Sequence, residues 1–276
     1  MTYGQLISQL EDRVEAAGEE RAALAYVFKE SKKWTTTEFV LNLQTPVPES
    51  DCELLEQICD QLCQHVPAQH ITGKAYFRDL TLAVNEHVLI PRPETEELVE
   101  LILAENSGAD LTVLDIGTGS GAIALALKKA RPNWQVTASD LSSKALAIAQ
   151  KNAQTEGLDV TFVQSDVYEN LAGQYDLIVS NPPYIAYADE DEVGQNVLLH
   201  EPHSALFADK DGYAIYEQIL ADAKAHLTES GKIYFEIGYK QGEGLQELAA
   251  TYLPYKQVRV LKDAFDKDRM VVLDDK

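Results

Sequence analysis

Beyond Leu111 the sequence alternates short apolar runs with longer amphipathic stretches. The apolar runs, each predicted as a strand, are TVLDIG from Thr112, QVTASD from Gln135, VTFVQSD from Val160, DLIVS from Asp176 and KIYFEIG from Lys232. The amphipathic stretches, each predicted as a helix, begin at Ala122, Ser143, Tyr213 and Gln241. Strands that alternate with helices form an open α/β sheet, so the sequence predicts a Rossmann-like fold with mostly parallel strands for this part of the chain.

Two more β-like segments close the chain. QVRVL from Gln257 and RMVVL from Arg269 are separated by a short polar stretch that includes DAFDKD. A parallel pair needs a connection of about a dozen residues or more. These two segments are therefore predicted to form an antiparallel C-terminal hairpin at the end of the sheet.

The first 70 residues have a helical pattern instead. Their apolar side chains recur three or four positions apart, as at Leu6, Leu10 and Val14, which predicts a bundle of about four helices. From Ile71 to Ile90 the pattern is β-like, and the PRPETEE stretch at Pro91 then begins a helix with an acidic first turn. The predicted organisation is a helical bundle over 1–70, a β-hairpin linker over 71–90 and the Rossmann-like domain over 91–276.

The charge balance excludes some partners. The 276 residues include 23 Lys and Arg against 45 Asp and Glu, a formal net charge of −22, and this charge opposes binding to duplex DNA or a bare membrane. The sequence has no long apolar run and no export signal at its start, so we expect a cytoplasmic protein. The spacing of Cys52, Cys59 and Cys63 matches neither a disulfide framework nor a common zinc pattern, so no metal site is predicted.

A glycine-rich loop follows the first strand of the alternating region. It contains Gly117, Thr118, Gly119, Ser120 and Gly121, in the pattern G-x-G-x-G. A Rossmann-like sheet binds ligands at this position, and the next strand ends at Asp140, whose carboxylate can accept hydrogen bonds from ribose hydroxyls. The pattern predicts a nucleoside ligand, with or without a pyrophosphate.

The third strand ends one position further along the same sheet edge, at Asp166 and Val167. These side chains are predicted to line a slot for adenine. Asp166 can accept from the exocyclic amine, and Val167 can cover the ring.

The most specific motif is Asn181-Pro182-Pro183-Tyr184, after the fourth strand. Each proline lacks an N–H and pushes the residue before it into an extended conformation, which leaves carbonyl oxygens with few competing donors. A planar NH₂ group fits there, with one hydrogen bonded to the Asn181 side-chain oxygen and the other to the Pro182 carbonyl, while Tyr184 stacks on the flat group. This arrangement suits alkylation of an amide or aromatic amine, because it orients a weak nitrogen nucleophile without a strong base.

These motifs resemble those of class I S-adenosylmethionine-dependent methyltransferases that modify planar nitrogen. Four further stretches resemble the HemK/PrmC family, which methylates the glutamine of the Gly-Gly-Gln motif in peptide chain release factors. They are PAQHITG from Pro67, IPRPETEELVE from Ile90, EPHSAL from Glu201 and FDKDRMVVL from Phe265. The resemblance spans residue 67 to the end and implies an enzyme that uses S-adenosyl-L-methionine and releases S-adenosyl-L-homocysteine.

The resemblance also implies site residues. Gly117 to Gly121 would hold the methionine part of the cofactor, Asp140 the ribose and Val167 the adenine edge, while many relatives carry an aromatic residue where Val167 stands. Asn181, Pro182, Pro183 and Tyr184 would bind the target glutamine, with Asn181 also near the methyl donor. The helical domain would contact the release factor, and we expect a monomer that binds no nucleic acid directly.

The motifs leave other functions open. A glutamine of a large-subunit ribosomal protein offers the same amide. Adenine in DNA also presents a planar NH₂, although base flipping normally needs a basic groove, which the net charge opposes. A non-catalytic module that binds the release factor or a nucleoside is the remaining alternative, and the intact Asn181 to Tyr184 motif favours an enzyme over it.

Overall fold

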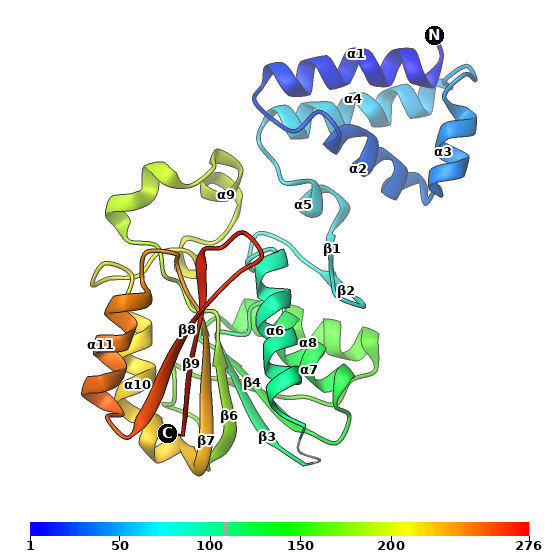
Figure 1. The fold of residues 1–276 in the computed structure, drawn as a ribbon. Helices are drawn as coiled ribbons and strands as arrows, with labels where there is room; N and C mark the ends of the chain where they lie inside the picture. Colours follow the sequence, from blue (N-terminus) through cyan, green and yellow to red (C-terminus); the bar gives the residue numbers. More distant parts are fainter. Residues whose placement is uncertain (108–109, 276) are drawn as a thin grey trace. The chain divides into compact units, whose positions relative to one another are not determined.

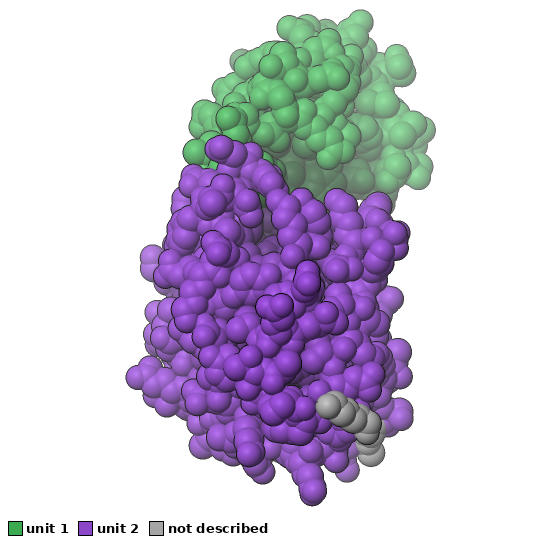
Figure 2. All heavy atoms as spheres, turned by 60° about the vertical axis from the view of Figure 1, so that its left-hand side comes forward, with its two compact units in different colours: residues 1–74, 193–201 green, residues 75–192, 202–276 purple. Residues whose placement is uncertain are grey.

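The computed structural model describes residues 1–107 and 110–275, which form two compact units (Figure 2). The first unit comprises Met1–Lys74 and Val193–Glu201, and the second comprises Ala75–Glu192 and Pro202–Lys276. The sequence pattern did not indicate that the segment Val193–Glu201 groups with the N-terminal residues. Within the first unit, His200 Nε2 lies 3.1 Å from the carbonyl oxygen of Gln64.

The first unit is helical. Its helices are α1 (Tyr3–Ala16), α2 (Ala23–Lys32), α3 (Thr36–Asn42), α4 (Glu49–Cys63), α5 (Ala68–Thr72) and α9 (Gln195–His200). The capping box at Thr35 and Glu38 begins α3, with reciprocal bonds between the side chain of each residue and the backbone N–H of the other. The bundle thus has a short fifth helix, α5, beyond the four expected over the first 70 residues.

The core of the first unit is built on three helices. Leu6, Leu10 and Val14 of α1 are buried, as their spacing predicts, and they pack with apolar residues of α2 and α4. One carboxylate, Asp51 in the first turn of α4, is buried among them. It accepts hydrogen bonds from Tyr3 Oη at 2.5 Å and Lys32 Nζ at 2.8 Å, and so ties three helices together.

A seven-stranded sheet forms the centre of the second unit. Its strands are β3 (Thr112–Ile116), β4 (Gln135–Asp140), β5 (Thr161–Gln164), β6 (Tyr175–Ser180), β7 (Leu227–Glu236), β8 (Lys256–Lys262) and β9 (Asp268–Asp275). The strand order is β5-β4-β3-β6-β7-β9-β8. The first five strands in this order are parallel, so their carboxyl ends meet at one edge.

The C-terminal strands confirm the predicted antiparallel pair. β9 pairs antiparallel with both β7 and β8, which leaves β8 at the edge of the sheet. The predicted fold class, N-terminal helices followed by a mostly parallel sheet that ends in an antiparallel hairpin, is confirmed.

Helices cover both faces of this sheet (Figure 1). One face packs against α6 (Pro93–Glu105), α7 (Ala122–Ala130) and α8 (Ser143–Glu156), and the other against α10 (Ala214–His226) and α11 (Gly242–Tyr252). Successive strand residues point to opposite faces, so Val113 joins the first core and Leu114 the second. Within the described ranges, no helix combines the length and apolar character needed to cross a membrane.

A two-stranded sheet precedes the large one. It consists of β1 (Lys74–Phe77) and β2 (Leu80–Ala83). Val84, Val88 and Ile90, which the sequence pattern placed in the same hairpin, lie outside its strands and pack in a small cluster with Ala75 and Ala145. Between β6 and α10 lie two short 3₁₀ helices, η1 (Tyr187–Glu192) and η2 (His203–Ala205).

Candidate active site

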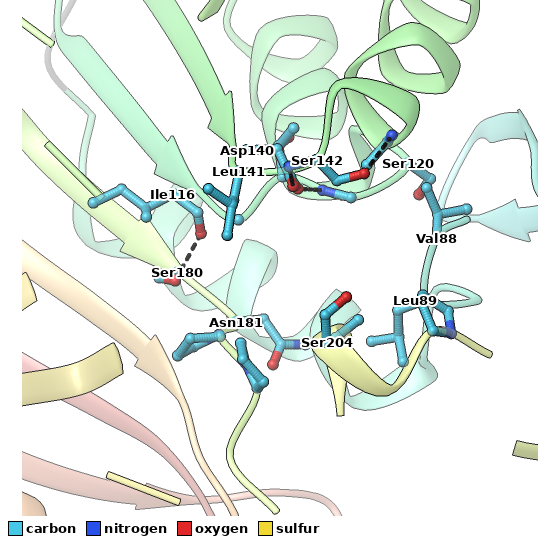
Figure 3. Close-up of a pocket in the computed structure, with 18 of the residues that line it drawn as sticks. Val88, Leu89, Ile116, Ser120, Asp140, Leu141, Ser142, Ser180, Asn181 and Ser204 are labelled. Carbon is cyan, nitrogen blue, oxygen red and sulfur yellow. Dashed lines mark hydrogen bonds between the residues drawn. The ribbon is translucent and has the colours of Figure 1, made fainter. Parts of the chain in front are cut away.

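The carboxyl ends of the parallel strands border one cavity of the second unit (Figure 3). The cavity is lined by residues that follow β3, β4, β5 and β6, by several residues between His87 and Thr95, and by Pro202, Ser204 and Ala205. Asp140 and Asn181, from two different strand ends, both border it. This is the edge at which open α/β sheets bind ligands.

The structure brings most of the predicted site residues together here. Those that line the cavity are Gly117, Thr118, Gly119, Ser120, Asp140, Asp166, Val167, Asn181, Pro182 and Pro183. Gly121 and Tyr184 are not among the lining residues. All the predicted site residues except these two therefore lie on one cavity.

The glycine loop is shaped for close approach of a ligand. Gly117 and Gly119 have φ angles of 73° and 56°, in the left-handed region that favours glycine, and a Cβ on either would meet nothing within 4 Å. Gly121 differs, because a Cβ there would lie 3.3 Å from the Ala149 Cβ of α8. The first two glycines leave open space beside the loop, whereas Gly121 lets α7 and α8 pack.

The backbone N–H groups of this loop mostly bond within the protein. Those of Gly117 and Thr118 both donate to the Ser139 carbonyl at 2.9 Å, and that of Gly121 donates to the Thr118 carbonyl at 2.8 Å. The Gly119 N–H donates to Asp140 Oδ2 at 2.9 Å. Donors that are already bonded cannot cradle a pyrophosphate, so the loop fits a nucleoside ligand without one.

Asp140 closes β4 with its carboxylate beside the loop. Besides the Gly119 bond, its Oδ1 accepts from the Ser142 N–H at 2.8 Å. Burial raises the pKa of this carboxyl, and the two backbone hydrogen bonds counter the rise. A carboxylate held in this way can accept from ligand hydroxyls through its remaining lone pairs.

Asp115 lies under the loop as a second buried acid. Its Oδ2 accepts from Thr118 Oγ1 at 2.7 Å and from the Ala124 N–H at 3.2 Å, while Oδ1 has no hydrogen-bond partner among the described residues. Burial raises its pKa to about 7, and the charge of Asp140 adds to the rise. Two neighbouring carboxyl groups favour a cationic ligand over an anionic one.

Asp166 and Val167 follow β5 and lie in different environments. Asp166 is exposed at the cavity wall, whereas Val167 is half-buried against the core around α10. Val167 has a φ angle of 44°, a conformation that a β-branched residue rarely adopts. Backbone strain of this kind clusters at ligand sites.

The loop after β6 is held from several sides. Ser180 Oγ donates to the Ile116 carbonyl at 2.7 Å (Figure 3), and Gln241 Nε2 donates to the Tyr184 carbonyl at 3.0 Å. The Tyr184 side chain packs against the core around α10, where burial raises its pKa to about 12. This phenol is therefore protonated at neutral pH.

Two residues to which the sequence pattern assigned no role are hydrogen-bonded behind Asn181. Asn181 Nδ2 donates to Thr95 Oγ1 at 3.2 Å, and Thr95 Oγ1 donates to Glu236 Oε2 at 2.6 Å. Both residues stood in motifs already singled out, IPRPETEE and KIYFEIG. Glu236 could have been singled out from the sequence, because it is an acidic residue at the end of an apolar strand, as Asp140 is.

The described residues bring no three His, Cys, Asp or Glu side chains together in an arrangement that could hold a metal ion. The three cysteines are free thiols.

Comparison with known proteins agrees with this geometry. Residues 5–73 match the family described as the PrmC N-terminal domain, and residues 94–209 match the methyltransferase small domain family. A crystal structure of a methyltransferase from Pyrococcus furiosus has the same fold, with a TM-score of 0.55 at 20% identity over 71% of this chain and 89% of that one.

Curated relatives cover the whole chain. The sequence is 53% identical over 276 residues to the release factor glutamine methyltransferase of Streptococcus pneumoniae, which covers 100% of this chain and 99% of the relative. It is 43% identical over 271 residues to the protein of that name from Enterococcus faecalis, over 98% of both chains. These matches confirm the resemblance found in the motifs, and the chain belongs to the release factor glutamine methyltransferase family.

Proposed function

We propose that the protein transfers a methyl group from S-adenosyl-L-methionine to the side-chain amide nitrogen of the glutamine in the Gly-Gly-Gln motif of peptide chain release factors. The observation that carries this proposal is the placement of the Asn181-Pro182-Pro183 segment on the same cavity as Asp140 and the glycine loop. Membership of the family supports the choice of acceptor.

The cavity fits this cofactor. S-adenosyl-L-methionine supplies an electrophilic methyl group on a sulfonium ion and leaves as S-adenosyl-L-homocysteine. Gly117 to Gly121 would hold its methionine part, which carries a cationic amine, above the buried Asp115. Asp140 would accept from the ribose hydroxyls, and Asp166 and Val167 would border the adenine.

The acceptor amide would be bound by the loop after β6. The Asn181 side-chain oxygen and the Pro182 carbonyl would each accept one hydrogen of the glutamine NH₂, which orients the nitrogen lone pair toward the methyl group. These two acceptors also stabilise the hydrogens as they become acidic in the transition state. Tyr184 would support the loop, since its carbonyl is bonded to Gln241 and its ring is packed against the core.

We propose that the protein acts in the cytoplasm as a monomer and that the helical unit contacts the release factor. The net charge of −22 favours a protein acceptor over duplex DNA.

The test is transfer of labelled methyl from S-adenosyl-L-methionine to unmethylated release factor, ribosomal proteins and duplex DNA in parallel. We expect label on the release factor, no label on its Gly-Gly-Gln variant with the glutamine replaced by alanine, and loss of transfer in the enzyme variant Asn181→Ala. Label on a ribosomal protein or on DNA in place of the release factor contradicts the proposed acceptor.

A second variant separates cofactor binding from acceptor binding. Asp140→Ala removes a charge-assisted hydrogen bond worth ~1.5 to 3 kcal/mol, so the Kd for S-adenosyl-L-methionine should rise roughly ten- to a hundredfold. Calorimetric titration measures this change directly. An unchanged Kd contradicts the assignment of Asp140 to the ribose.

A further inference from the structure

The side-chain amide of Asn181 can take two orientations, and only one of them can bind the acceptor NH₂. Its amide is nearly symmetric in shape, yet only the oxygen can accept a hydrogen bond from an acceptor NH₂. If the amide turned over, its NH₂ group would face the substrate NH₂ and donor would meet donor. Something in the protein has to fix which atom faces the cavity.

Two buried side chains behind Asn181 form a hydrogen-bonded chain with it. Thr95, in the first turn of α6, is 4% exposed, and Glu236, the last residue of β7, is 1% exposed. Thr95 Oγ1 lies 2.6 Å from Glu236 Oε2 and 3.2 Å from Asn181 Nδ2. Three elements distant in sequence thus meet in one network.

The donor and the acceptor in each of these hydrogen bonds follow from the number of protons available. An ionised carboxylate only accepts, so the single hydroxyl proton of Thr95 must be donated to Glu236. The Thr95 oxygen can then only accept from Asn181, which requires that Nδ2 faces Thr95. Oδ1 is thereby left as the amide atom that serves the substrate.

We propose that Thr95 and Glu236 are positioning residues that lock the Asn181 amide with its oxygen available to the acceptor glutamine. This inference rests on the proposed function and adds to it a reason why the reaction depends on a buried carboxylate. Neither residue touches the reacting atoms, because both act through Asn181.

Protonation of Glu236 would release the lock. A carboxylic acid can donate to Thr95 Oγ1, and the Thr95 hydroxyl is then free to donate to Asn181 Oδ1 and turn the amide over. Burial raises the pKa of Glu236 to about 7, while the Thr95 bond and the charge of Arg269 on β9 oppose the rise. The lock therefore engages as the pH rises through about 7.

Other groups around Glu236 modulate this titration. The charge of Glu94 on α6 raises its pKa further, and a hydrogen bond from Asn181 lowers it. From α10, Tyr216 Oη donates to the Glu236 carbonyl at 2.6 Å, and burial holds the pKa of that phenol well above its usual value. The Tyr184 phenol is also protonated at neutral pH, so the charged side chains that act on the Glu236 carboxyl are Arg269, which lowers its pKa, and Glu94, which raises it.

The experiment compares the pH dependence of methyl transfer in the wild type and three variants. Wild-type transfer should fall as the pH drops below about 7. Glu236→Gln should lose this acid limb and be roughly ten- to a hundredfold slower at pH 8, because the amide orientation is no longer imposed. Thr95→Val should be slowed similarly, and Thr95→Ser, which keeps the hydroxyl, should restore transfer. The Kd for S-adenosyl-L-methionine should stay within about twofold throughout.

A matched control separates positioning from stability. Thr112→Val removes another threonine-to-carboxylate bond of the same sheet, from Thr112 Oγ1 to Asp176 Oδ2 at 2.8 Å, at the opposite ends of the strands. This variant should keep the wild-type pH profile. Parallel pH profiles for wild type and Glu236→Gln, or a folded Thr95→Val with wild-type transfer, overturn the proposal.

A spectroscopic measurement tests the lock without any methyl acceptor. The side-chain ¹⁵N amide signal of Asn181, assigned by its loss in Asn181→Ala, should shift with pH around 7 in the wild type and not in Glu236→Gln. If the wild type labels no release factor but this titration is seen, the proposed function fails and the lock stands. If the release factor is labelled and the titration is absent, the lock fails alone.

Discussion

At the scale of the residue, the protonation state of the buried Glu236 that favours the folded protein differs from the one that orients Asn181. Burial raises its pKa to about 7, above the ~4.3 of an unfolded chain. The folded state therefore binds the proton more tightly, so the stability that this carboxyl contributes is fully present below about pH 4.3 and is lost as the pH rises through 7. The ionised form that orients Asn181 is the less stable one.

This linkage gives a measurable difference between two proteins. Between pH 4.5 and pH 8, wild type should lose ~3 kcal/mol of unfolding free energy relative to Glu236→Gln, because the variant has no carboxyl to ionise. Denaturant unfolding at several pH values measures the difference. If the difference in unfolding free energy between wild type and Glu236→Gln does not change with pH, the pKa of Glu236 is the same in the folded and unfolded protein.

At the scale of the element, the glycine before α10, Gly212, lies close to the backbone of the loop after β6. A Cβ on Gly212 would lie 2.1 Å from the Tyr184 carbonyl oxygen, and its φ angle is 85°. Gly212→Ala should therefore displace the acceptor loop and slow methyl transfer by roughly tenfold or more, while the cofactor Kd changes little, because the glycine loop is untouched.

Gly157 offers the matched control for this change. It ends α8 with a φ angle of 66°, and a Cβ there would meet nothing within 4 Å. Gly157→Ala should cost only the backbone strain of about 1 kcal/mol that both variants share. Equal transfer rates in the two folded variants would contradict a special role for Gly212.

The same elements show what the sequence could predict. Parallel strands bring their carboxyl ends to one edge whatever their side chains are, so the motifs after β3, β4 and β6 could be assigned to one cavity from the strand pattern alone. The contacts of Tyr184 with Gly212 and Gln241 could not be predicted, because they join loops whose paths are set by packing. For the same reason Thr95 stood in a recognised motif with no role assigned to it.

At the scale of the whole molecule, each hydrophobic cluster takes its residues from one unit. One cluster joins α1, α2 and α4, and the others lie on and beside the sheet of the second unit. Ligand binding stabilises the part of a protein that must fold to bind. Cofactor at a hundred times its Kd should therefore slow hydrogen exchange in the sheet by an amount equivalent to ~2.7 kcal/mol. Exchange in α1 and α4 should be the same with and without cofactor.

Asp51 allows the first unit to be weakened by itself. Burial acts to raise the pKa of Asp51, but hydrogen bonds from Lys32 and Tyr3 outweigh it and hold the pKa below its usual value. Asp51→Ala leaves these partners unsatisfied, so exchange in α1 and α4 should accelerate by an amount equivalent to ~2 to 4 kcal/mol. Asp60→Ala on the same helix, which removes an exposed partner of Arg13, should cost below ~1 kcal/mol. Cofactor protection of the sheet should be unchanged in both variants, and protection that falls with Asp51→Ala would show that the two units fold as one.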